Sequence, residues 1–264
     1  MTAPAVQHAS PAPQPGPSIP AWTWIAVFTR MLAIQGAWNY ETLLGNGIGF
    51  CLEPALRHLP GGPHGPAFKQ AMARESTYFN AHPYLAAVAV GALARAELSG
   101  VPAERIERFR TALAGPLGSV GDRLVWAGWL PFASLLALAA FGLGARPLLV
   151  VGIFLVLFNA GHFALRAWGL RVGWKHGLAV APSLGTPLLR RGPAHLARAA
   201  AAAAGVAVPL AAARVLGGSH VMLATVLGVA AMLSVVLIRV HGRVEGYKLA
   251  LVLIALFALI SVAR

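Results

Sequence analysis

The second half of the chain alternates long apolar runs with short basic segments. The apolar runs occupy residues 124–144, 147–170, 197–217, 220–238 and 249–263. A helix needs roughly 20 apolar residues to cross the hydrocarbon core of a bilayer, and most of these runs are close to that length. The pattern predicts an all-α integral membrane protein with about five transmembrane helices in its C-terminal half.

The first half has shorter and more mixed segments. Residues 21–38 are apolar and aromatic but carry Arg30, which favours an interfacial helix. Residues 50–58 and 66–80 predict two more interfacial helices, joined by a turn rich in Pro and Gly. Residues 83–96 are apolar but too short for a confident crossing, so they predict a segment that is re-entrant or buried in protein.

Composition and charge divide the chain into three regions. Residues 1–20 form a tail rich in Pro and Ala that lacks the features of a secretory signal, and we expect it to be disordered. Residues 21–123 are then a cytoplasm-facing region of interfacial and re-entrant helices, and residues 124–264 are the transmembrane region. The basic loops 171–198 and 239–248 favour the cytoplasmic side, which with five crossings puts the N-terminus there as well.

Composition excludes an ordinary soluble domain, because 58% of residues are hydrophobic, only 11% are charged and the mean hydropathy is +0.69. The 21 Lys and Arg against 8 Asp and Glu lie mainly between apolar runs. That placement indicates topology determinants that contact anionic lipid headgroups, and it argues against nucleic acid as a partner. The single cysteine, Cys51, excludes an intrachain disulfide, and no catalytic constellation, metal-ligand spacing or cofactor motif is recognisable.

The segment 115–122 holds the only aspartate of the chain, Asp122. Gly115, Pro116, Gly118 and Gly121 predict a turn that ends the preceding helix, with Asp122 capping the next one. The alternative is functional, because a glycine-rich break beside a spanning helix is where transporters expose backbone groups to a polar solute.

A polar stripe interrupts the run at 147–170. Asn159, His162 and Arg166 are three and four residues apart and therefore share one helix face. Arg166 either faces the protein interior or extends along the helix to the membrane surface. Asn159 contacts either another helix or a solute.

Five motifs, taken together, resemble one family. They are QGAWN at 35–39, GIGFCLEPAL at 47–56, YFNAHPYLA at 78–86, LAGPLGSVGDRLVW at 113–126 and LFNAGHFALRAWGLRVGWKHG at 157–177. They are similar, in order and spacing, to the IID membrane component of the mannose/fructose/sorbose-type sugar phosphotransferase system.

The resemblance implies a subunit of the bacterial cytoplasmic membrane that does not work alone. Such a subunit pairs with a IIC membrane protein in a hetero-oligomer and translocates a hexose. Soluble IIA and IIB proteins carry the phosphoryl group from phosphoenolpyruvate, so no phosphohistidine is expected in this chain.

The same motifs contain side chains that suit a sugar. Amide and carboxylate groups pair with hydroxyls, and aromatic faces cover a pyranose ring. The candidate substrate-binding residues are Asn80, Asp122, Trp126, Asn39 and Trp38. We expect the helix-breaking motif around Asn80 and Pro83 to approach the one before Asp122.

Three residues depart from the family pattern. Arg123 stands where a small residue or Pro is usual, His162 replaces a basic residue, and Thr77 replaces an acidic one. These changes leave a second interpretation open, in which the chain is a non-transporting membrane partner that docks phosphotransferase proteins for regulation.

Overall fold

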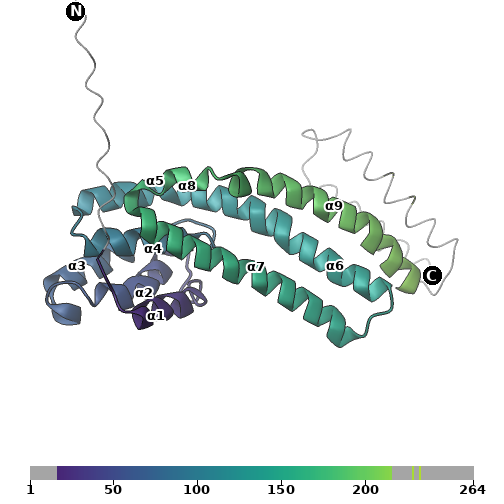
Figure 1. Cartoon of the computed structure of the whole chain (residues 1–264), viewed down its shortest axis with the longest axis horizontal. Coiled ribbons are helices and arrows are strands. Elements are labelled where there is room, and N and C mark those ends of the chain that lie inside the picture. Colours follow the sequence, from purple (N-terminus) through teal and green to yellow (C-terminus); the bar gives the residue numbers. More distant parts are fainter. Residues whose placement is uncertain (1–16, 216–227, 229–231, 233–264) are drawn as a thin grey trace, which may run out of the picture.

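The computed structural model describes residues 17–215 together with residues 228 and 232 (Figure 1). Within these residues the fold is helical, and the only β-type pairing consists of isolated bridges that join Leu43 to Asn39 and to Phe79. Of the predicted crossings, 249–263 lies outside the described residues, and so does 220–238 apart from two positions. The predicted fold class is therefore confirmed as all-helical, whereas the number of crossings stays a prediction.

Four helices gather at one end of the molecule (Figure 1). They are α1 (Ala21–Met31), α2 (Gly45–Leu56), α3 (Pro66–Glu75) and α4 (Ala86–Leu98), with a 3-10 turn, η1 (Gly62–His64), before α3. Nearly every residue of α4 is buried, so this helix forms the centre of the core. The short apolar segment at 83–96 is thus buried in protein, as one of its two interpretations predicted.

Three long helical stretches extend away from this end. Ala103–Gly142, Pro147–Ala179 and Ala181–Val215 are each long and apolar enough to cross a membrane. Their long helices α6 (Leu130–Gly142), α7 (Pro147–His176) and α9 (Pro187–Val215) carry three of the five predicted runs. The helices α6 and α9 leave the domain of α1–α4 in the same direction, and α7 returns toward it (Figure 1).

Small residues form the contact of α9 with α6 and with the π-helical segment η2 (Asp122–Trp129) that precedes it. A Cβ atom added to Gly128 would lie 3.0 Å from Leu196, and one added to Gly142 would lie 2.6 Å from Leu210. Between these points Ala133 and Ala207 are fully buried. The alanine-rich helix therefore packs closely on a neighbouring helix over its length.

The predicted break before Asp122 is wrong. Helix α5 (Ala103–Gly121) continues without interruption through a π-helical segment, η2 (Asp122–Trp129), into α6. Asp122 has helical backbone angles and makes no capping hydrogen bond. Pro116 lies inside α5, and Gly121 serves close packing instead of a turn, whereas a Cβ atom on Gly115 would meet nothing within 4 Å.

The basic segment 171–198, predicted to be a loop, is mostly helical. α7 runs on to His176, a 3-10 turn η3 (Gly177–Ala179) and α8 (Ala181–Leu184) follow, and α9 begins at Pro187. Arg95 of α4 donates hydrogen bonds to the carbonyls of Trp174 and Lys175, which satisfies carbonyl groups near the end of α7. Lys and Arg are good helix formers, so a basic stretch does not by itself indicate a loop.

Glycine also fixes α7 against α4. A Cβ atom on Gly173 would lie 2.1 Å from the carbonyl oxygen of Val88, and one on Gly91 would lie 2.3 Å from that of Leu170. The two backbones therefore touch directly, which only glycine permits. This contact fastens the spanning helix α7 to the core of the domain.

Candidate functional site

Four of the predicted sugar-binding residues line one cavity of about 370 Å³. Trp38 comes from the loop between α1 and α2, Asn80 from the segment before α4, and Asp122 and Trp126 from η2. The cavity thus joins segments more than 80 positions apart in the sequence, as the predicted approach of the Asn80 and Asp122 motifs requires.

The cavity wall combines hydroxyl-pairing groups with aromatic surface. The amides of Gln35 and Asn80, the hydroxyl of Ser119 and the carboxyl of Asp122 all belong to its lining. Trp38 and Trp126 remain 46% and 40% exposed, so their faces are available to a bound molecule. This is the combination of groups that recognises a polyhydroxylated ring.

Asn39 does not line the cavity and instead shapes the loop that does. Its Oδ1 accepts hydrogen bonds from the backbone N–H groups of Glu41 and Thr42, both at 2.9 Å. Its Nδ2 donates to the hydroxyl of Thr42 at 2.9 Å. These bonds form an Asx turn, so the structure gives Asn39 a positioning role beside Trp38.

Backbone bonds then tie this loop to the Asn80 segment. The N–H of Leu44 donates to the carbonyl of Phe79 at 3.0 Å, and the N–H of Phe79 donates to the carbonyl of Thr42 at 3.1 Å. Between them Leu43, a cavity residue, has φ of 51°, in the left-handed region that non-glycine residues avoid. The surrounding bonds hold this strained position in place.

A buried ion pair also holds the segment that carries Asn80. Arg110 of α5 pairs with Glu75 and donates from Nη2 to the carbonyl of Thr77 at 2.9 Å. Its guanidinium lies 5.2 Å from the ring centre of Phe79. The position of Asn80 is therefore fixed by neighbours on both α3 and α5.

His82 is a cavity residue that the sequence analysis did not single out. Its ring is 1% exposed, and its Nδ1 accepts a hydrogen bond from the backbone N–H of Tyr84 at 3.2 Å. The ring hydrogen of neutral His82 is then on Nε2, which has no hydrogen-bond partner among the described residues. Its position inside the motif at 78–86 is the sequence feature that could have identified it as a cavity residue.

The protonation state of His82 follows from its surroundings. Burial, reinforced by the positive charge of Arg166, lowers its pKa to about 4. The ring is therefore neutral near pH 7 and presents a single N–H donor. An unpaired donor in a buried position is costly unless a ligand or water completes it.

Only some of the remaining motif residues line the cavity. Gly115, Gly118 and Pro83 belong to its lining. Gly121 lies behind it against the His82 ring, and Pro116 lies within α5 outside the lining.

Two residues of the polar stripe of α7, His162 and Arg166, pack against the ring of Tyr84. Arg166 is buried, donates to the carbonyl of Met31 and lies 4.7 Å from the ring centre of Tyr84. The interpretation of Arg166 as a side chain that extends to the membrane surface is therefore wrong. His162 stacks on Tyr84 at 4.9 Å, and Tyr84 contacts His82 at 5.0 Å.

Asn159 is satisfied within its own helix. Its Nδ2 donates to the carbonyl of Leu155 at 2.6 Å, and its Oδ1 lies 2.8 Å from Nε2 of His162. Within the part of the chain that the structure describes, these hydrogen bonds stay within α7 and do not reach another helix.

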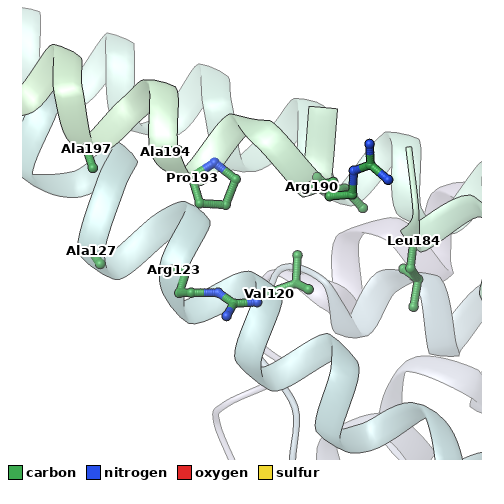
Figure 2. A pocket seen from close by; sticks show the side chains of 9 residues that line it. Val120, Arg123, Ala127, Leu184, Arg190, Pro193, Ala194 and Ala197 are labelled. Carbon is green, nitrogen blue, oxygen red and sulfur yellow. The ribbon is translucent and has the colours of Figure 1, made fainter. Parts of the chain in front are cut away.

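Two of the residues that depart from the family pattern, Arg123 and Thr77, lie outside the cavity lining. Arg123 follows Asp122 in sequence but lines a different groove, between η2 and α9 (Figure 2). Thr77 donates from its hydroxyl to the carbonyl of Arg74 at 2.7 Å, as a local turn contact. Neither side chain belongs to the cavity lining.

Comparisons with known sequences find a matching family and several relatives. Residues 19–208 match the sequence profile of the PTS system mannose/fructose/sorbose family IID component. The mannose-specific EIID component of Escherichia coli K12 is 34% identical over 172 residues, which are 62% of this chain and 59% of that protein. The sorbose-specific EIID component of Klebsiella pneumoniae is 31% identical, over 63% of this chain and 61% of that protein. The chain therefore matches about three fifths of the length of these relatives.

Solved structures share the fold. One described as a membrane protein has a TM-score of 0.61 and 27% identity, over 70% of this chain and 69% of that one. The complex of the mannose transporter ManYZ with microcin E492 contains a chain with a TM-score of 0.56 and 24% identity. That similarity covers 93% of this chain and 96% of that one, and at this identity it concerns the fold alone.

Proposed function

Because this chain belongs to the mannose/fructose/sorbose family of phosphotransferase-system IID components, we propose that it is a membrane subunit through which a hexose is taken up and phosphorylated. In this proposal the chain pairs with a IIC membrane subunit in the bacterial inner membrane. Soluble IIA and IIB proteins supply the phosphoryl group from phosphoenolpyruvate. The chain itself contributes part of the sugar path.

The observation that carries this proposal is the cavity that unites Trp38, Asn80, Asp122 and Trp126. In our proposal Asn80 and Asp122 pair with sugar hydroxyls, and the two indole rings cover the apolar face of the ring. The unpaired Nε2–H of His82 donates a further hydrogen bond. The π-helical form of η2 supports a functional role, because such segments occur often at functional sites.

The charge distribution supports the orientation. Arg171 and Lys175 lie at the end of α7 that meets α4, and Arg190 and Arg191 lie at the start of α9. Basic residues near the ends of spanning helices favour the cytoplasm. We therefore propose that the domain of α1–α4, and the cavity beside it, face the cytoplasm, where IIB would reach a translocated sugar.

The test is sugar-dependent phosphorylation. Membranes that carry this chain with its cognate IIC subunit are mixed with purified soluble phosphotransferase proteins and phosphoenolpyruvate, and mannose, fructose, sorbose and amino sugars are scanned. We expect one or more sugar phosphates to appear only when this chain is present. A stable complex with IIC that yields no product from any sugar would contradict the transport function and favour the regulatory alternative.

Two variants connect that activity to the cavity. We expect Asn80→Ala and Asp122→Asn to lower sugar phosphorylation at least tenfold, because each loses a hydroxyl partner worth about 1.5 kcal/mol or more. Matched controls are Asn46→Ala and Glu104→Gln, which change an exposed amide and an exposed carboxylate outside the cavity. Wild-type rates in both cavity variants, at normal membrane insertion, would remove the cavity from the mechanism.

A further inference from the structure

A second hollow, of about 520 Å³, lies on a different side of η2 from the sugar cavity. Its walls come from residues 120–127 and from the stretch between Leu184 and Ala197 (Figure 2). Most of its lining is apolar, and the exceptions are two arginines, Arg123 and Arg190. We call it the Arg123–Arg190 groove.

The two arginines come from opposite walls of the groove (Figure 2). Both are exposed, and no carboxylate of the described residues forms an ion pair with either one. Asp122, the nearest acid in sequence to Arg123, lines the sugar cavity instead. An anion that enters the groove can pair with one cation from each wall.

The chemistry of the two arginines limits which anions the groove can bind. Guanidinium groups present a planar set of donors that matches the oxygens of a phosphate, and they are less strongly hydrated than ammonium groups. Phosphate and carboxylate are therefore the anions that two arginines recognise best.

The positions of the two arginines along the helices favour a lipid phosphate among these anions. Arg123 directly precedes the apolar run 124–144, and Arg190 precedes the apolar part of α9. Because α6 and α9 leave the domain in the same direction, both arginines lie at the same end of the membrane-spanning helices. That end is where the phosphate groups of a lipid leaflet lie.

The rest of the groove suits an acyl chain. Pro193, Ala194 and Ala197 on α9 and Ala127 on η2 form an apolar trough. Alanine leaves space between the two helices that larger side chains would fill. Basic pockets between spanning helices are a known setting for anionic headgroups.

We propose that the Arg123–Arg190 groove binds one anionic phospholipid, with its phosphate held by the two guanidinium groups and one acyl chain along Ala127 and Ala197. The bound lipid joins η2 to the start of α9 and so supports the segment that carries Asp122 and Trp126. This site does not depend on sugar transport, and its test uses neither sugar nor partner proteins.

The experiment is native mass spectrometry of the delipidated full-length chain, titrated with phosphatidylglycerol, phosphatidylcholine or inorganic phosphate. We expect phosphatidylglycerol to bind with clear preference over phosphatidylcholine. Arg123→Gln and Arg190→Gln should each weaken phosphatidylglycerol about fivefold. Arg146→Gln, which removes an exposed arginine at the opposite end of the helices, is the matched control and should leave the affinity unchanged.

A third variant tests the acyl chain. Ala197→Phe keeps both arginines and fills the trough, so it should also weaken phosphatidylglycerol. Circular dichroism checks that each variant is folded. A glutamine variant that is not folded is replaced by Arg123→Lys with Arg190→Lys, which keeps both charges but loses the planar guanidinium donors and should still weaken phosphatidylglycerol. Equal binding of the two lipids would overturn the proposal. So would glutamine variants that match the control, or inorganic phosphate that competes as well as the lipid.

Discussion

The α-carbon of Gly121 lies directly against the side chain of His82. A Cβ atom added to Gly121 would stand 2.2 Å from Cβ of His82 and 2.4 Å from its Cγ. The absence of a side chain at Gly121 therefore lets α5 approach the segment that carries Asn80, and the cavity lined by Asn80 and Asp122 lies beside this contact.

This contact predicts the effect of Gly121→Ala. The added methyl group must displace the His82 ring or separate α5 from it, at a cost of about 1–3 kcal/mol for overpacking. We expect a lower thermal midpoint in detergent and reduced sugar phosphorylation. Gly152→Ala is the control, because nothing lies within 4 Å of a Cβ atom there. Equal midpoints for the two variants would show that the ring moves aside freely.

The lowered pKa of His82 predicts a dependence of stability on pH. Because burial lowers the pKa from 6.5 to about 4, the unfolded chain binds a proton more readily than the folded one in that interval. His82 therefore leaves stability unaffected above about pH 6.5. It lowers stability by about 1.4 kcal/mol for each pH unit as the pH falls toward 4.

The measurement is the thermal midpoint of the wild type and His82→Gln between pH 4 and 8. Glutamine keeps a hydrogen-bond donor and does not titrate, so the fall in the midpoint toward pH 4 should be shallower in the variant. Parallel curves would mean that the ring is accessible to protons in the folded state.

A buried ion pair between α3 and α4 predicts a large effect from a single change. Arg74 donates to both carboxylate oxygens of Glu97 at 2.7–2.9 Å, and the two side chains are 15% and 5% exposed. Arg74→Met leaves a buried carboxylate without its partner and should cost about 3–5 kcal/mol. This loss of stability is measured as the change in the free energy of unfolding in denaturant.

The matched control for that pair is Arg57→Met. Arg57 pairs with Glu53, but its side chain is 55% exposed, and Arg30 also pairs with Glu53. Water replaces such a partner at a cost of about 1 kcal/mol or less. Similar losses in the two variants would mean that solvent reaches Glu97.

The contact between α7 and α4 predicts a fourth effect. Gly173→Val forces the two backbones apart, because a Cβ atom would lie 2.1 Å from the carbonyl of Val88. We expect the spanning helices to insert while the domain of α1–α4 becomes sensitive to protease. Gly152→Val, at the open position, should keep wild-type resistance, and protease resistance in Gly173→Val would contradict the predicted separation.

The sequence by itself determined the properties that depend on local composition. The apolar runs at 124–144 and 147–170 specify spanning helices, because 20 apolar residues are stable only in lipid or in a large core. The motifs that identify the family, including Asn80, Trp126 and Asp122, are likewise readable without a structure.

Only the tertiary structure decided what those residues contact. Glycine and proline at 115–121 favour a turn locally, but packing against His82 keeps the helix continuous, and packing energies exceed propensities of about 1 kcal/mol. Adjacent residues point to different sides of a helix, so Asp122 and Arg123 line separate hollows. The burial of Arg166 depends on a carbonyl 135 positions away, at Met31, which no local pattern reveals.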